Sequence, residues 1–280
     1  MKTILYFSFV CSLFTCLPNN ALGQLQGGLT IDWADNILTI HGDFPGKELK
    51  TWYLEAYCRP NSHEAEWNRT VIGHKTRLME KSADKKKIVL ECKLNDGVIA
   101  RHVITAGADN VDFQITVQNP TKKESAAHWG QPCIRVGDFT GLGEKDKRTY
   151  AYLKKSFVFQ NGRLQTMPTS DWATKARYEP GQVWRAPGVK PADVNPRPLN
   201  KNVPDNGLIG CFGKHDKLLM ATAFEPYQEL FQGVITCLHS DFRIGGLKPG
   251  EEKKIKGKIY ILKNDVAALV KRYKKDFQSR

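Results

Sequence analysis

The sequence lacks the short motifs that carry many common reactions. It has no nucleophile elbow, no glycine-rich phosphate loop and no nucleotide-binding motif, and Gly141-Leu-Gly143 is too short to count as one. No cysteine has the CxxC spacing of a zinc or redox site. There is no internal repeat and no alternation of strands with helices. These absences argue against a nucleotide-dependent enzyme, a thiol redox protein and a parallel α/β fold.

Long apolar runs are also scarce, and the one that exists lies at the N-terminus. Residues 4–17 are apolar, Lys2 precedes them, and Ala21–Gly23 supply small residues of the kind found at cleavage sites. The run is too short to cross a bilayer comfortably. We therefore predict a signal peptide over residues 1–23 and a secreted or periplasmic mature chain, cleaved near Gly23, with no membrane span.

Cysteine usage does not suggest a disulfide framework. Five cysteines follow the predicted signal peptide, so at least one of them has no partner within the chain. Each lies among apolar neighbours, which favours small buried side chains over disulfides, although any pairing stays open. These residues are Cys58, Cys92, Cys133, Cys211 and Cys237.

Acidic residues are fewer than basic ones, 29 against 42, which gives a net charge of +13. The lysines are spread thinly along the chain, which is typical of a solvated basic surface rather than a nucleic-acid groove. For an exported protein, a carbohydrate, including an anionic one, is therefore the predicted partner, and nucleic acid is not. Nothing in the spacing of potential ligands predicts a metal or another cofactor.

The mature chain reads almost entirely as β-strands. Residues 87–94 and 98–105 flank Asn95-Asp96-Gly97, a hairpin signal. Apolar residues alternate with polar ones over 111–117, the period of a half-buried strand. Further strands are predicted at 31–40, 49–57, 71–80, 131–136, 155–160, 207–212, 217–224, 233–243 and 254–262. A short C-terminal helix begins at Asn264 or Asp265. We expect one all-β antiparallel domain over residues 24–280.

One segment interrupts this pattern. Between Glu179 and Gly207 lie Pro180, Pro187, Pro191, Pro196, Pro198 and Pro204. Prolines this dense do not fit central strands, and long loops in compact domains usually serve a function. We expect an ordered loop that lines a cleft, with Trp184 and Arg197 as ligand contacts.

Polar side chains concentrate in two other places. The first is 225–243, where Glu225, Tyr227 and Glu229 precede a strand with His239, Asp241 and Arg243 on one face. That face is either solvent or a cleft, and Glu229 is either a site residue or an ion-pair partner of Arg243. The second place is His128, Trp129, Gln131 and Arg135, where a tryptophan face and directional polar groups suit a sugar. Trp129 and His128 have the alternative of being buried structural residues.

The order of these strands resembles the galactose mutarotase-like family, the β-supersandwich of aldose 1-epimerases. Two short stretches carry the resemblance within residues 71–262. Ile115-Thr-Val-Gln-Asn119 precedes Ala127-His128-Trp-Gly-Gln131, and Glu225-Pro226 precedes Leu247-Lys-Pro-Gly-Glu251 and the strand 255–262. The resemblance implies an antiparallel β-supersandwich fold.

The resemblance also implies roles for individual residues. His128 would contact a sugar hydroxyl or ring oxygen, and Glu225 or Glu229 would be the general base. The second histidine that the resemblance implies as general acid has no counterpart between His128 and His215, and either His128 or His239 is a candidate proton donor.

Together these observations predict an exported carbohydrate-active protein, an acid/base enzyme on glycans of the hydrolase, lyase or epimerase type. The alternative is a non-catalytic carbohydrate-binding module or an envelope structural protein. The candidate catalytic residues are Glu225, His128 and His239. The candidate binding residues are Trp129, Gln131, Arg135, Trp184, Arg197, Tyr227, Glu229, Asp241 and Arg243.

Overall fold

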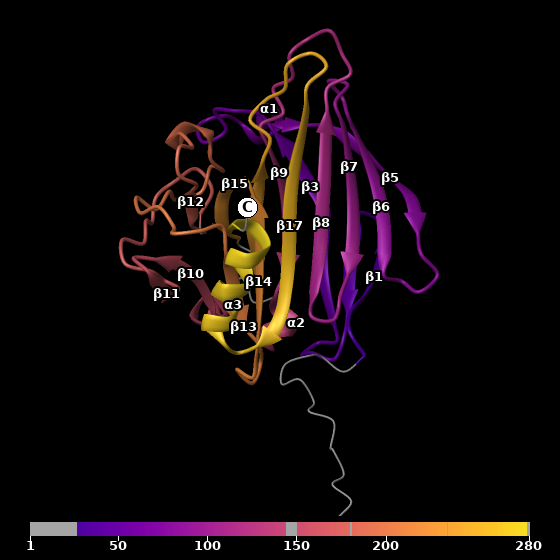
Figure 1. The fold of residues 1–280 in the computed structure, drawn as a ribbon. Helices are drawn as coiled ribbons and strands as arrows, with labels where there is room; N and C mark the ends of the chain where they lie inside the picture. The colour runs from indigo at the N-terminus through magenta and orange to yellow at the C-terminus, as the bar shows by residue number, and fades with distance from the viewer. Residues whose placement is uncertain (1–26, 144–149, 180, 234, 279–280) are drawn as a thin grey trace, which may run out of the picture.

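Two antiparallel β-sheets form the body of the protein, and a helix follows the last strand (Figure 1). The computed structural model describes residues 27–143, 150–179, 181–233 and 235–278. Apolar side chains from both sheets meet in one large buried cluster between them. The predicted all-β antiparallel sandwich with a short C-terminal helix is therefore confirmed.

The first sheet has eight strands. They are β1 (Thr30–Ala34), β2 (Ile37–His41), β3 (Glu48–Cys58), β4 (Val71–Ile72), β9 (Trp129–Arg135), β12 (Val183–Arg185), β15 (Tyr227–Gln232) and β16 (Cys237–Arg243). Their order is β1-β2-β3-β9-β16-β15-β12, with β4 paired to β3. This order places β3, β9 and β16, which are far apart in the sequence, side by side in the middle of the sheet.

The second sheet has nine strands. They are β5 (His74–Lys81), β6 (Lys87–Leu94), β7 (Ile99–Ala106), β8 (Asn110–Gln118), β10 (Ser156–Gln160), β11 (Arg163–Thr166), β13 (Ile209–Phe212), β14 (Leu218–Glu225) and β17 (Glu252–Lys263). Their order is β11-β10-β13-β14-β17-β8-β7-β6-β5. The hairpin predicted around Asn95–Gly97 joins β6 to β7.

Helices are few and short. α1 (Trp67–Thr70) and α2 (Gly137–Thr140) are single turns, and 3₁₀ turns occur at Ala151–Lys155 and Pro191–Asp193. α3 (Val266–Tyr273) continues as a π-helical segment over Lys274–Gln278. The Asp265 side chain caps α3 by accepting the Ala268 backbone N–H at 2.9 Å. Leu269 and Tyr273 pack on the outer face of the second sheet, where Figure 1 shows the helix lying over β13 and β14.

The core between the sheets includes a buried histidine. His102 of β7 is fully buried among aromatic rings, and the hydroxyls of Tyr53 and Tyr57 each lie 2.7 Å from one of its ring nitrogens. Both nitrogens are therefore satisfied, as a buried polar group requires. This histidine ties β3 of the first sheet to β7 of the second.

Two predicted strands are each divided in the structure. Residues 71–80 form β4 in the first sheet and β5 in the second. Residues 31–40 form the hairpin of β1 and β2, because Asp35 and Asn36 adopt left-handed φ values of 51° and 60° and reverse the chain. Aspartate and asparagine tolerate this conformation better than other residues with a side chain.

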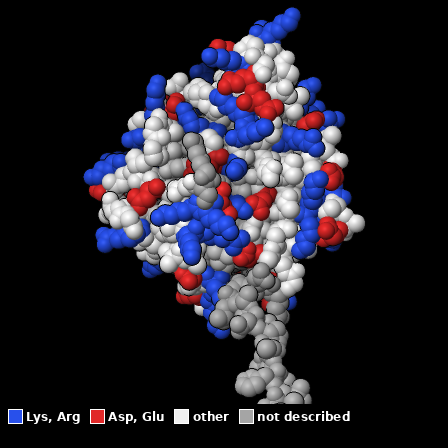
Figure 2. Space-filling view, in the orientation of Figure 1, with Lys and Arg blue, Asp and Glu red and all other residues white. Residues whose placement is uncertain are grey.

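Further predictions concern charge, covalent bonds and location. On the face drawn in Figure 2, lysines and arginines are spread over the surface with acidic residues among them. The five cysteines after the predicted signal peptide are free and buried, as small apolar residues would be. Within the described residues, no helix is long and apolar enough to cross a membrane. The predicted signal peptide lies outside the described residues, and the prediction of one mature domain stays a prediction.

Candidate functional site

The outer face of the first sheet, away from the second sheet, carries a polar surface at its centre. Strand alternation separates the two faces. Ile134, Leu238 and Phe242 join the core between the sheets, whereas Gln131 and His239 point the other way into a cavity. The alternation expected for the strand that holds His239 and Asp241 therefore places them away from the inter-sheet core.

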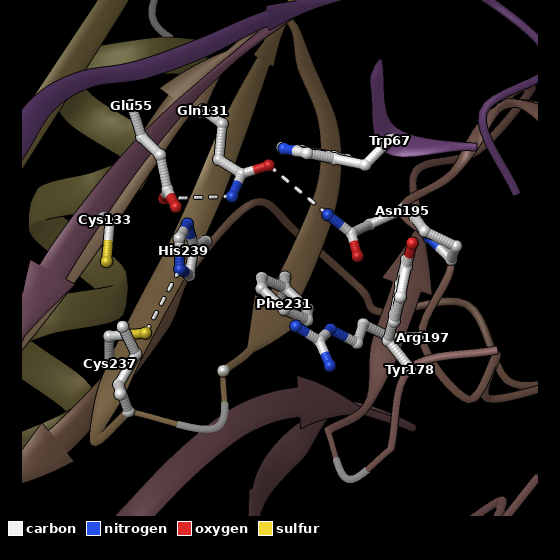
Figure 3. Close-up of a pocket in the computed structure, with 13 residues that line it drawn as sticks. Glu55, Trp67, Gln131, Cys133, Tyr178, Asn195, Arg197, Phe231, Cys237 and His239 are labelled. Carbon is white, nitrogen blue, oxygen red and sulfur yellow. Dashed lines mark hydrogen bonds between the residues drawn. The ribbon is translucent and has the colours of Figure 1, made fainter. Parts of the chain in front are cut away.

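Loops close over this face and leave a cavity of about 360 Å³ (Figure 3). The volume is within the range of small-molecule sites. Residues from β3, β9, β15, β16, α1 and the proline-rich segment line it, together with Tyr178 just before that segment and two residues between β15 and β16. They are Glu55, Trp67, Gln131, Cys133, Tyr178, Asn195, Pro196, Arg197, Phe231, Gly233, Ile235, Cys237 and His239.

A chain of hydrogen bonds runs along one wall of the cavity. The Gln131 amide donates to Glu55 Oε2 at 3.0 Å, and the Asn195 amide donates to Gln131 Oε1 at 3.3 Å. Figure 3 shows the three side chains in a row. The pairing of β3 with β9 is irregular between Trp52 and Ala56, and this bulge falls on the residues that precede and include Glu55. The bulge lets Tyr53 enter the core while Glu55, two residues on, lines the cavity.

Aromatic rings and one cation form the opposite wall. The guanidinium of Arg197 lies 5.5 Å from the ring centre of Tyr178 and 5.6 Å from that of Phe231. Arg197 and Asn195 come from the proline-rich segment, which is held in place by β12 at the edge of the sheet and by a 2.9 Å bond from Asn200 N–H to the Val183 carbonyl. Asn195, Pro196 and Arg197 of this segment form an ordered wall of the cavity.

Three ionisable side chains follow one another along β16. Cys237 Sγ lies 3.3 Å from His239 Nε2, and His239 Nδ1 lies 3.6 Å from Asp241 Oδ1. A hydrogen bond from the Cys133 thiol lowers the pKa of Cys237 well below its usual value. Burial opposes a charge on His239, but Cys237 and Asp241 outweigh it and raise its pKa to about 10. The neighbouring groups therefore favour a negative charge on Cys237 and a positive charge on His239.

A buried pair of carboxyl groups continues this array. Glu229 and Asp241 are opposite each other on β15 and β16, and neither is exposed. Burial raises the pKa of both, to about 7 for Asp241, and the charge of Asp241 further raises the pKa of Glu229. Glu229 accepts the Asn195 backbone N–H at 3.0 Å. The predicted alternative partner of Glu229, Arg243, donates to Gln228 Oε1 at 2.6 Å.

Glu225 and Tyr227 lie apart from the cavity. The Glu225 carboxylate accepts a hydrogen bond from the Tyr273 hydroxyl of the C-terminal helix, and burial raises its pKa. Tyr227 is buried in the core beside Gly207. The structure thus places the glutamate that the family resemblance suggested as base against α3.

The histidine and tryptophans that the sequence singled out also lie elsewhere. His128 borders a separate shallow hollow with Ser125, Gly246 and Lys253. Trp129 is buried in a small cluster with Ala56 and Cys58. Trp184 is fully buried and packs against Trp172, with ring centres 6.1 Å apart.

Of the sequence-predicted residues, the structure brings Gln131, Arg197 and His239 together around the cavity. Asp241 and Glu229 lie behind His239, and the charge of Arg135 acts on the thiols of Cys133 and Cys237. Sequence reasoning did not select Glu55, Trp67, Tyr178, Asn195 or Phe231. Nor did it select Cys133 and Cys237, although both share the alternation of Gln131 and His239, which is the signal that points to them.

Comparison with known proteins gives a distant likeness in fold. No protein-family model matches the chain, and no curated protein matches it. The chain is similar to three solved structures, each 8% identical: a protein of Synechocystis sp. PCC 6803 (83% of this chain, 95% of that one, TM-score 0.46), a galactose mutarotase-like protein from Lactobacillus casei (84%, 100%, 0.42) and galactose 1-epimerase from Lactobacillus acidophilus (84%, 97%, 0.41).

The second and third of these structures carry names from the group that the sequence resembles. At this level of identity and TM-score, the likeness concerns the arrangement of strands. Roles for individual residues therefore depend on the side chains of this chain alone.

Proposed function

We propose that the cavity binds a small saccharide and that the protein is a carbohydrate-active enzyme that epimerises an aldose at its anomeric carbon. The observation that carries this proposal is the composition of the cavity. Aromatic rings (Trp67, Tyr178, Phe231) share it with a carboxylate, two carboxamides and a guanidinium. A sugar presents apolar C–H faces together with several hydroxyls, so both kinds of group in the cavity would find a match.

Binding would divide between the two walls. The rings of Trp67, Tyr178 and Phe231 offer apolar faces to the C–H groups of a pyranose. Gln131 and Asn195 supply both hydrogen-bond donors and acceptors, and Arg197 supplies donors only. A sugar hydroxyl can therefore either donate to or accept from the side chains of the cavity. The hydrogen bonds that join Glu55, Gln131 and Asn195 hold these three side chains in place before a ligand arrives. This reduces the entropy cost of binding.

Glu55 is the proposed general base. It takes the proton of the anomeric hydroxyl while the ring C–O bond breaks and the ring oxygen receives a proton from the Tyr178 hydroxyl. The open-chain aldehyde then rotates about its C1–C2 bond and closes by the reverse steps, which return both protons. Epimerisation fits better than glycoside hydrolysis, which normally requires two carboxyl groups facing the bond. Glu55 is the one carboxylate among the described residues that line the cavity.

The test combines binding with turnover. Thermal shifts of the full chain against neutral monosaccharides, oligosaccharides and uronic acids identify a ligand, because a ligand of the folded state raises the melting temperature. Polarimetry of a freshly dissolved single anomer of that sugar then measures epimerisation. Glu55→Gln should lower the rate by about 10²–10⁴-fold and keep most of the binding.

Glu48→Gln is the matched control, because Glu48 lies on the same strand but is exposed. It should leave both measurements unchanged. Binding without acceleration in the wild-type protein would turn the proposal toward a non-catalytic binding module. An absence of any saccharide shift would contradict saccharide binding itself.

A further inference from the structure

Three metal-binding side chains meet at one side of the cavity. The Sγ atoms of Cys133 and Cys237 and a ring nitrogen of His239 all lie within 4.8 Å of one another, and all three residues are buried. Cys237 and His239 share a face of β16, and Cys133 comes from the neighbouring strand β9. Because two different strands supply the ligands, the sequence contains no CxxC spacing that would indicate the cluster.

The spacing of these atoms suits a tetrahedral ion. Zinc lies about 2.3 Å from a thiolate and about 2.0 Å from an imidazole nitrogen, so the sulfur and nitrogen ligands of one ion are about 3.5 Å apart. Cys237 Sγ and His239 Nε2 are 3.3 Å apart. Two thiolates and one imidazole are soft donors that select zinc over calcium or magnesium.

Asp241 supplies a second, independent indication. Its carboxylate lies 3.6 Å from Nδ1 of His239, and Nε2 is the nitrogen that faces Cys237. A carboxylate on the far nitrogen of a histidine ligand is the usual arrangement in zinc sites, because it fixes the orientation and tautomer of the ring. Figure 3 shows His239 between Glu55 and Cys237, on the wall of the cavity.

We propose that Cys133, Cys237 and His239 form a zinc site that opens into the cavity. Three protein ligands leave a fourth position, as in catalytic rather than structural zinc sites. All three ligands line the cavity, so an oxygen atom of water or of a bound molecule would fill that position. There the ion would act as a Lewis acid on that oxygen. The site goes beyond the proposed function and is testable without any saccharide.

Cys133 and Cys237 could also be in one of two other chemical states. A disulfide between Cys133 and Cys237 would remove both ligands, and a metal-free Cys237 thiolate would be an alkylation target. Both cysteines are free in the structure. The experiment therefore has to separate zinc binding from a disulfide and from a reactive thiol.

The experiment titrates the reduced, chelator-treated full chain with Zn²⁺ and then with Co²⁺. We expect one zinc per chain by elemental analysis and competition with a chromogenic chelator. With Co²⁺, we expect thiolate charge-transfer bands and the intense visible bands of a tetrahedral site. Cys133→Ser and Cys237→Ser should each lose these bands. Asp241→Asn should retain the stoichiometry but weaken zinc binding by about 10–100-fold.

Cys211→Ser is the matched control, since Cys211 is also buried and free but lies on β13 of the other sheet. It should bind zinc as the wild type does. A thermal melt of each variant shows that it is folded. The proposal is overturned by a reduced, folded wild type that takes up no zinc, by zinc that persists in the double variant C133S/C237S, or by peptide mapping that finds a Cys133–Cys237 disulfide in the protein as purified.

Discussion

Two histidines are equally buried in this protein, and their surroundings give them opposite character. His102 lies between the sheets and His239 on the outer face of the first sheet, with side-chain exposures of 0% and 1%. Burial, with a further contribution from His74, lowers the pKa of His102 to about 3. Cys237 and Asp241 raise the pKa of His239 to about 10 despite equal burial.

The difference shows that partners, rather than depth, decide what a buried histidine does. Tyrosine hydroxyls satisfy both nitrogens of His102 without a charge, so this residue is suited to holding two sheets together. A thiol and a carboxylate on either side of His239 are groups that exchange protons or hold a metal. We therefore assign His102 to structure and His239 to the site.

The largest effect that tests this comparison is on stability. His102→Ala removes a ring from the core and leaves two tyrosine hydroxyls without a partner, so we expect it to lower the free energy of unfolding by about 3–5 kcal/mol. Zinc binding by the variant that remains folded should be unchanged. Urea unfolding and the Co²⁺ spectrum measure the two quantities.

His239→Ala is the matched variant for this prediction. It should lose the Co²⁺ spectrum, because it removes one of the three proposed ligands. The contrast between the two histidines is contradicted if His102→Ala abolishes metal binding in folded protein. It is also contradicted if this variant lowers the free energy of unfolding by less than about 1 kcal/mol, the value expected of an ordinary hydrogen bond.

A somewhat smaller predicted effect is a loss of stability at acidic pH. The pKa of His102 falls from 6.5 in the unfolded chain to about 3 in the folded one, so protons bind the unfolded chain more tightly. Its contribution to stability is complete above pH 6.5 and is lost as the pH falls toward 3, by about 1.4 kcal/mol per pH unit. Between pH 6.5 and 4 the loss should be about 3 kcal/mol.

Other titratable groups also face this histidine, so the measurement needs a reference. Tyr53 and Tyr57 of β3 contact the ring, and His74 of β5 and Cys92 of β6 lie close by. His102→Gln removes the titration of residue 102 and leaves the others in place. The free energy of unfolding of the wild type minus that of this variant should decrease as the pH is lowered below 6.5. A difference that stays constant would contradict the low pKa of His102.

The fold and one half of the site follow from simple alternation in the sequence. The period of two placed His239 and Asp241 on one face, which is the polar one, and Gln131 was selected because its amide lies in a stretch of polar and aromatic residues. The same rule points to Cys133 and Cys237, but their spacing gives no metal signature, because their proximity depends on β9 pairing with β16. Strand order across a sheet is a property of the whole fold.

The other half of the site depends on structural features that the alternation of polar and apolar residues does not predict. Glu55 lines the cavity because the pairing of β3 with β9 is irregular just before it, and a bulge is not visible in the letters 52–56. Glu225 looked like a site residue because polar side chains concentrate over 225–243 and because the family resemblance suggested it as the general base. In the structure its carboxylate meets Tyr273, a contact made only once α3 packs back on the second sheet.

The smallest predicted effect concerns which nitrogen of His102 carries the proton. A neutral imidazole has one donor and one acceptor, so one tyrosine must donate to the ring and the other must accept from it. The Tyr57 hydroxyl also lies beside the Cys92 sulfur, which can accept its proton. We therefore expect Nε2–H to donate to Tyr57, and Tyr53 to donate to Nδ1.

Nitrogen NMR of the imidazole at neutral pH distinguishes the two tautomers directly, and we expect the Nε2–H form. Tyr53→Phe and Tyr57→Phe should each cost about 1–2 kcal/mol, because each leaves one buried ring nitrogen without its partner. Tyr57→Phe should cost slightly more, since it also removes the contact with Cys92. The Nδ1–H form, or a protonated ring at pH 7, would show that the core histidine is not the neutral structural group that distinguishes it from His239.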